Sequence, residues 1–128
     1  MDVMTSKYKN KKCEFDNGNE ILKFDSQAER ARYIDLFDSQ RRGVISNLHC
    51  QPKFLLSEGF FRNGKKYRAE FYIADFEYRE DYQTVIEDVK GMETAVYKSK
   101  RKRFLELNPD LIFRELRLKG HRWEITEL

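Results

Sequence analysis

Two β-rich runs joined by a short polar stretch constrain the fold more than any other part of the sequence. Residues 72–78 and 85–91 are rich in aromatic and β-branched side chains, and the polar residues 79–83 lie between them. This pattern is typical of a β-hairpin. Because side chains alternate between the two faces of a strand, Asp88 and Lys90 point to the same side. Asp75, on the first run, is expected to lie across from them.

The combination of Asp75, Asp88 and Lys90 suits a site for a divalent cation. Hard cations such as Mg²⁺ bind carboxylate oxygens and water. A bound ion lowers the pKa of a water ligand and stabilises charge on a phosphoryl oxygen. Lys90 would orient that water or neutralise the developing charge. Together these residues provide the parts for hydrolysing a phosphodiester.

The competing interpretation is a solvated sheet face. Asp75 and Asp88 would then be exposed acids, with Lys90 paired to one of them across the strands. The apolar neighbours of both acids favour the site instead, because they make both strands look central and a central strand seldom buries charge.

The first helix brings in another carboxylate. Ser26 followed by Glu29, ahead of an apolar-periodic run that stops at Gly43, is the capping-box pattern. Glu29 also shares a helix face with Tyr33 and Leu36. Two roles are therefore open for Glu29, a helix cap alone or a third carboxylate directed at the sheet. Its place on the apolar stripe favours the second.

The order of the elements predicts an α/β fold of the mixed α+β kind, with a central mixed β-sheet flanked by helices. A helix at 95–107 starts at a Thr94 N-cap and ends before Pro109. It separates strands at 84–90 and 111–116. The three elements form a βαβ unit, whose strands should be parallel with a right-handed crossover.

Shorter signals complete the predicted organisation. Residues 1–10 are expected to form a flexible basic N-terminal arm, and residues 11–128 a single domain. The other expected elements are a hairpin around Asn17-Gly18, a strand at 53–56, a turn at Asn63-Gly64, one long strand over 66–78 with room for a bend near Glu70, and a last strand within 121–128.

The net charge of +3 permits a nucleic-acid partner, and the distribution of cations favours DNA. Lysines and arginines cluster in the N-terminal arm and on the helix at 95–107, whose start should lie near the acids. Phosphates are attracted there by the helix N–H groups and by the side-chain charges. A solvated helix face is the plainer interpretation. The predicted DNA contacts are Lys9, Lys11, Lys12, Lys98, Lys100, Arg101 and Lys102.

Cysteine, histidine and hydropathy patterns narrow the class of protein further. Cys13 and Cys50 have no CxxC spacing and are expected to be reduced thiols of a cytoplasmic protein. His49 and His121 are too few to complete a zinc site with them. We expect no signal peptide and no membrane partner, because no apolar run has the required length.

The acids and the lysine resemble a known nuclease motif. Asp75, followed by Asp88-Val89-Lys90, is similar to the PD-(D/E)XK motif, with Ala74 in place of Pro and Asp88 in place of the commoner Glu. The ordered set of acidic helix, two acidic strands, basic helix and final strand resembles that nuclease superfamily.

Within the superfamily, the chain resembles phage Holliday-junction resolvases of the endonuclease I type and a family of small phage proteins assigned there. Phrases such as Tyr72-Ile-Ala-Asp-Phe and Glu87-Asp-Val-Lys-Gly carry this likeness, which covers about residues 8–116. The resemblance implies a restriction-endonuclease-like core of order αβββαβ. It also implies dependence on Mg²⁺ or Mn²⁺ and hydrolysis that leaves a 5′-phosphate.

The resemblance also assigns roles to residues. Glu29, Asp75 and Asp88 would be metal ligands, with the Val89 carbonyl as a further one, and Lys90 would be the catalytic lysine.

Strand register decides which acid takes part. A shift of one residue would turn Glu87 rather than Asp88 toward the metal. Glu87-x-Val89 lacks the lysine, so Asp88 is preferred.

The predicted function is a metal-dependent endonuclease of branched DNA, a phage Holliday-junction resolvase acting in the host cytoplasm. Resolvases of this kind are homodimers, because two symmetric cuts need two sites. One alternative is a nuclease of the same fold acting on linear or mismatched duplex. The other is a non-catalytic DNA-binding protein accessory to recombination or packaging, against which the intact set of acids and Lys90 argues.

Overall fold

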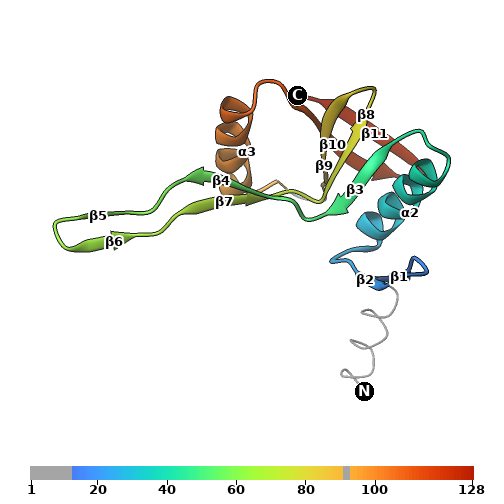
Figure 1. Ribbon diagram of the computed structural model, residues 1–128, viewed down its shortest axis with the longest axis horizontal. Helices are drawn as coiled ribbons and strands as arrows, with labels where there is room; N and C mark the ends of the chain where they lie inside the picture. Colours follow the sequence, from blue (N-terminus) through green and yellow to red (C-terminus); the bar gives the residue numbers. More distant parts are fainter. Residues whose placement is uncertain (1–12, 91–92) are drawn as a thin grey trace, which may run out of the picture.

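A five-stranded mixed sheet forms the centre of the molecule (Figure 1). The computed structural model describes residues 13–90 and 93–128. Strands β9 and β10 run parallel, and the other neighbours are antiparallel. In sheet order the strands are β11 (Arg122–Glu127), β10 (Ile112–Lys119), β9 (Gln83–Val89), β8 (Phe76–Glu80) and β3 (Ser46–Cys50).

The predicted βαβ unit is confirmed at the middle of this sheet. Helix α3 (Ala95–Leu107) connects β9 to β10, which pair in parallel from Val85 opposite Ile112 to Val89 opposite Leu116. Thr94 caps the helix, because its side-chain oxygen accepts the Tyr97 N–H at 3.0 Å. A parallel pair needs such a crossover connection.

The sheet is covered by apolar packing on both faces. Neighbouring residues of β9 alternate between the two cores, with Val85 in one and Ile86 in the other. Helix α2 (Gln27–Arg41) packs on the first face through Tyr33 and Leu36, and α3 packs on the second through Phe104. The prediction of a central mixed sheet flanked by helices is therefore confirmed at this level of detail.

The helices start where their sequence signals predict, but α3 buries few of its apolar side chains. Ser26 Oγ accepts the Glu29 N–H at 3.1 Å and so caps α2. On α3, Phe104 is fully buried, but Val96 and Leu107 are exposed. No helix within the described residues is long and apolar enough to cross a bilayer.

The two ends of the described chain both pack near α2. The predicted N-terminal hairpin is present as β1 (Glu14–Asp16) and β2 (Ile21–Lys23). The predicted final strand is β11, whose Trp123 indole N–H donates to Asp35 Oδ2 at 3.0 Å on α2. The predicted N-terminal arm, with Lys9, Lys11 and Lys12, lies outside the described residues.

The single long strand predicted over 66–78 is wrong. The segment is divided into β6 (Lys65–Tyr67), β7 (Glu70–Ile73) and β8, with Ala74 and Asp75 between the last two. Asp75 is where pairing changes, because its N–H still bonds to Glu87 on β9 while the Ala74 N–H bonds to the Pro52 carbonyl. Beyond this point β7 pairs with β4 (Lys53–Ser57) instead of the central sheet.

The chain between β4 and β7 extends away from the body as a narrow hairpin (Figure 1). Its strands are β5 (Phe60–Arg62) and β6, which pair with each other around the predicted Asn63-Gly64 turn. Both turn residues have positive φ, 50° and 75°, as a two-residue hairpin turn requires. We call residues 58–69 the projecting hairpin.

Candidate active site

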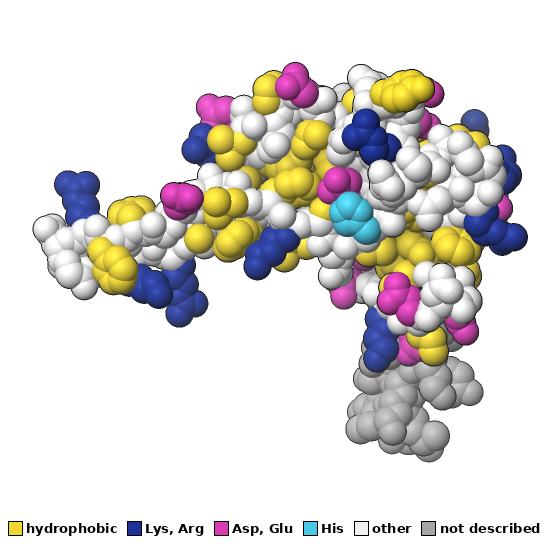
Figure 2. Space-filling view, viewed as in Figure 1, with side chains coloured by type: hydrophobic (Ala, Val, Ile, Leu, Met, Phe, Trp, Pro, Cys, Tyr) yellow, Lys and Arg dark blue, Asp and Glu magenta, His cyan; other side chains and the backbone are white. Residues whose placement is uncertain are grey.

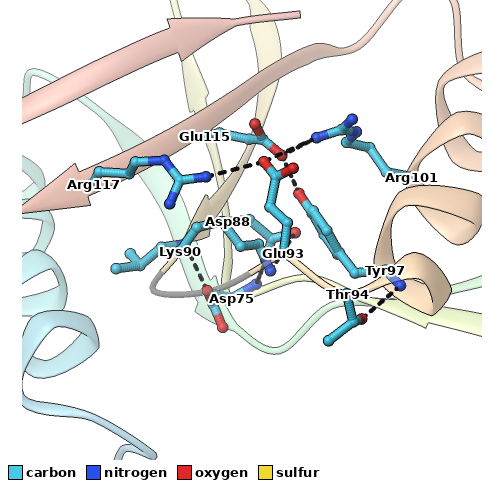
Figure 3. A network of polar contacts seen from close by, with 10 residues as sticks. Asp75, Asp88, Lys90, Glu93, Thr94, Tyr97, Arg101, Glu115 and Arg117 are labelled. Atoms are coloured by element: carbon cyan, nitrogen blue, oxygen red, sulfur yellow. Dashed lines mark hydrogen bonds and ion pairs between the residues drawn. The ribbon is translucent and has the colours of Figure 1, made fainter.

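Asp75 and Asp88 lie close together at the edge of the central sheet, where β7 leads into β8 and β9 ends. The Val89 N–H donates to Asp75 Oδ2 at 2.7 Å, and the Asp75 N–H donates to Asp88 Oδ1 at 3.1 Å. Figure 3 shows the two side chains beside Lys90. The backbone thus fixes one oxygen of each carboxylate, and the predicted proximity of the two acids is present.

The Asp88 carboxylate is buried with one oxygen lacking a hydrogen bond. The residue is 2% exposed, and within the described residues Asp88 Oδ2 has no hydrogen-bond partner. Burial raises the pKa of Asp88 to about 7, although the nearby Lys90 charge lowers it. A buried carboxylate oxygen without a hydrogen bond is costly. The Lys90 ammonium lies 3.7 Å from Asp88 Oδ2, beyond hydrogen-bond distance, so a metal ion beside this oxygen would relieve the cost.

Lys90 is positioned by contacts on two sides. Its ammonium lies 3.7 Å from Asp88 Oδ2 and 3.7 Å from the centre of the Tyr97 ring on α3. The Lys90 backbone N–H donates to the Leu116 carbonyl on β10 at 2.8 Å. The cation is therefore held next to the two acids by a strand, a helix and a cation–π contact.

Glu29 approaches the same region from the first turn of α2. It lines a cavity of about 140 Å³ together with Asp75, Cys50 and neighbouring residues. Burial, followed by the charge of Asp75, raises the pKa of Glu29 to about 7. The Ser26 cap uses the Glu29 backbone N–H. The Glu29 carboxylate also accepts a backbone hydrogen bond from Asp25 and still lines the cavity.

The structure brings two of the predicted metal ligands close together, and their role as ligands stays a prediction. In the part of the chain that the structure describes, no three His, Cys, Asp or Glu side chains are grouped to hold one metal ion. Asp75 and Asp88 form a close pair, whereas Glu29 reaches the adjoining cavity. The Val89 N–H contacts Asp75, and its carbonyl stays a predicted ligand.

Glu87 belongs to the opposite face of the sheet. Both of its carboxylate oxygens accept hydrogen bonds from Arg32 on α2, each at 2.7 Å, and one also accepts the Tyr78 O–H. The residue is fully buried, so this bidentate pair neutralises it inside the core. The structure thus separates Glu87 from Asp88, which the sequence-based preference for Asp88 anticipated.

A second polar network next to the acids was not anticipated. Glu115 on β10 lies opposite Asp88 in the parallel register. It accepts the Tyr97 O–H and an N–H of Arg101 at 2.6 Å, while Arg101 and Arg117 also bond to Glu93 (Figure 3). The only sequence signal was a glutamate within the apolar run at 111–116.

This network changes the interpretation of one predicted DNA contact. The Arg101 guanidinium forms ion pairs with Glu115 and Glu93. These two carboxylates compensate its charge, which is therefore not free for a phosphate. Lys98 lies 3.7 Å from Glu93 and is largely exposed. Lys102 is exposed and Lys100 half-buried on α3, so these lysines stay predicted contacts.

Comparisons with known proteins give a family but no function. The fold is similar to a solved structure described as "Crystal structure of SSO0001", with a TM-score of 0.45 and 15% identity. The likeness covers 76% of this chain and 48% of that one, so the chain spans about half its length. None of the curated proteins compared matches the sequence. A family model described as "Protein of unknown function (DUF1064)" matches residues 5–125, and the chain therefore belongs to that family.

Proposed function

We propose that this protein is a metal-dependent DNA endonuclease that hydrolyses phosphodiester bonds in branched DNA. The observation that carries the proposal is the buried pair of carboxylates, Asp75 and Asp88, held by backbone N–H groups beside the Lys90 ammonium. Structural ion pairs satisfy their oxygens, as Glu87 does. Asp88 Oδ2 has no hydrogen bond among the described residues, only the Lys90 ammonium at 3.7 Å, which favours a ligand over a purely structural role.

The donor set fits Mg²⁺ or Mn²⁺ better than a soft metal. Mg²⁺ is commonly bound through one or two carboxylates, with waters and substrate phosphate completing its shell. Asp75 and Asp88 would hold the ion, with Glu29 and the Val89 carbonyl as further candidates. When bound, the ion would supply a water of lowered pKa and stabilise charge on a phosphoryl oxygen.

The side chains around the pair divide the remaining work. Lys90 places a positive charge next to the carboxylates and would stabilise the negative charge that develops on the phosphate. The Tyr97 ring and Asp88 keep its ammonium in place. Glu29, whose pKa is raised to about 7, faces the cavity that Asp75 lines and would hold an attacking water there.

Substrate and assembly follow from the resemblance to junction-resolving nucleases. A four-way junction would be cut at two symmetric positions, so the active species would be a homodimer with one site per chain. The restriction-endonuclease-like core belongs to the same proposal. The confirmed strand–helix–strand order around the acids supports it.

The deciding experiment compares a labelled four-way junction with linear duplex of the same sequence. Wild type and Asp88→Asn would be incubated with Mg²⁺, with Mn²⁺ and with chelator, and the products resolved on denaturing gels. We expect paired, metal-dependent nicks in the junction and a loss of at least about 100-fold in Asp88→Asn, because the metal pair is broken.

Glu87→Gln is the matched control, because it removes the neighbouring charge from the opposite face of the same strand. A folded Glu87→Gln protein should cut at a rate near that of wild type. Equal cutting of linear duplex would replace the branched substrate with a general one. DNA binding without cutting under either metal would leave a non-catalytic accessory protein.

A further inference from the structure

The projecting hairpin combines exposed aromatic rings with positive charge. All six residues of β5 and β6 are exposed. Its cations are Arg62, Lys65, Lys66 and Arg68, against the single acid Glu58 within the same segment. Figure 2 shows Lys and Arg side chains along both edges of the hairpin, with hydrophobic side chains between them.

Strand register distributes these groups over the two faces. Phe60 lies opposite Tyr67 and Arg62 opposite Lys65, so these four share one face. The rings of Phe60 and Tyr67 stack with centroids 4.8 Å apart and an interplanar angle of 10°. The other face carries Phe61, which is 72% exposed, opposite Lys66. Each face therefore presents an aromatic surface beside at least one cation.

An isolated two-stranded hairpin is only marginally stable in water, and large exposed rings add to that cost. The close packing at its base is nevertheless specific. A side chain at Gly59 would meet the Tyr67 carbonyl at 2.9 Å, so the strands leave the body in tight contact. The segment is thus built as a defined hairpin although no core covers it.

We propose that the projecting hairpin is a DNA-binding element that contacts the substrate beyond the cleavage site. A two-stranded β-ribbon fits the major groove of duplex DNA, its cations suit phosphates, and an open ring face such as that of Phe61 suits an unpaired base. The inference rests on the proposed function only for the choice of DNA as the ligand.

The hairpin is also connected directly to the acids. Strand β7 leads from the hairpin to Asp75, and Lys66 precedes Asp75 by nine positions. At about 3.3 Å per residue, Lys66 lies at most roughly 30 Å from the acid, about nine base pairs along a duplex. The hairpin therefore extends the footprint on one side of the cut.

The test measures binding of a fluorescein-labelled four-way junction in chelator, where no metal-dependent cleavage occurs. The variant Arg62→Gln/Lys65→Gln/Lys66→Gln should bind at least about tenfold more weakly at low salt. Its plot of log affinity against log salt should lose a slope of about 2 to 3, roughly one for each phosphate contact removed. Arg42→Gln/Lys119→Gln/Arg122→Gln, which removes equal charge from exposed positions elsewhere, should bind within about twofold of wild type.

Phe61→Ala tests the aromatic contribution separately. On a junction that carries an unpaired base, it should weaken binding by roughly fivefold or more, with an unchanged salt slope and little change on plain duplex. Circular dichroism melts and mass measurement would accompany every variant.

Unchanged affinity and an unchanged salt slope in the hairpin triple variant would overturn the proposal. A change in molar mass from dimer to monomer would also overturn it, because the hairpin would then contact a second copy of the chain. Cleavage by wild type with Mg²⁺ is read independently. Its absence would remove the nuclease while leaving the binding result intact.

Discussion

Two neighbouring acids of β9 have opposite chemical surroundings, and this contrast defines the site. Glu87 meets a guanidinium and a phenol on the α2 side, so both of its oxygens are satisfied. Asp88, on the α3 side, has one oxygen without a hydrogen bond and an ammonium at 3.7 Å. The contacts of Glu87 stabilise the core, whereas the unsatisfied oxygen of Asp88 could bind a further cation.

Glu29→Gln separates the two roles of that residue. The Ser26 cap accepts the backbone N–H of residue 29, which glutamine retains, so the fold should not lose stability. Cleavage should fall by at least roughly 10-fold, the loss that even an outer partner of a metal site gives. Normal cleavage rates in a gel assay would show that Glu29 serves only the start of the helix and has no role in cleavage.

Ser26→Ala is the matched variant for the cap. It should lower the free energy of unfolding by about 1 kcal/mol and leave the cleavage rate of the folded enzyme unchanged. Urea titration followed by circular dichroism measures the first quantity.

Glu115 should make stability depend on pH in the acid range. Burial disfavours its charge, but hydrogen bonds from Tyr97 and Arg101 outweigh burial and lower its pKa below 4.5. The unfolded chain therefore binds this proton at a higher pH than the folded protein. The stabilisation from Glu115 is complete above about pH 4.5 and is lost as the pH falls through the folded pKa.

The comparison that isolates this effect is wild type against Glu115→Gln. The difference between their melting midpoints should be largest near neutral pH and shrink toward about pH 3. A constant difference across that range would show that the charge of Glu115 does not contribute.

The sequence predicted which face each acid of β9 takes but not what each acid meets. Alternation along a strand is a local rule, so Asp88 and Lys90 could be assigned to one side. Arg32 lies 55 residues before Glu87, and their contact depends on where α2 packs. Tyr97 and Arg101 could not be predicted as partners of Glu115 for the same reason. Their contact depends on where α3 packs against the sheet.

At the scale of elements, the turn between β8 and β9 is strained for its sequence. Asp81 and Tyr82 both have positive φ, 51° and 65°, in a two-residue turn that normally favours glycine at its second position. The Tyr82 side chain is 96% exposed, so packing does not offset the strain.

Tyr82→Gly should therefore raise the free energy of unfolding, by up to about 1 kcal/mol. Tyr82→Ala is the control, because alanine keeps the unfavourable left-handed conformation and should give no gain. Urea unfolding of both variants checks this, and equal stability of the two would refute the strain argument.

Elements that are marked by nearby cap or turn residues were predictable. Elements that depend on pairing between distant segments were not. Ser26 and Thr94 mark the starts of both helices because a cap is made within a few residues. The sequence pattern placed residues 79–83 between the two strands, yet Arg79 and Glu80 pair with Thr84 and Gln83 in the ladder. The break at Asp75 had no local signal, because it arises where the chain changes partner, from β4 along β7 to β9 along β8.

For the whole molecule, the order of elements was predictable because connection rules are general. A helix that joins two strands of one sheet usually makes them parallel, and β9 and β10 do pair in parallel. The projecting hairpin follows no such rule. Its turn was recognisable at Asn63-Gly64, but its separation from the body depends on the pairing of β4 with β7.

The contact between Trp123 and α2 gives the molecule a built-in optical reporter. The chain contains one tryptophan, and its indole is bonded to Asp35 with the Arg32 guanidinium 5.8 Å from the ring centre. Helix α2 comes early in the chain and β11 comes last. Intrinsic fluorescence therefore reports whether the last strand, β11, is packed against α2.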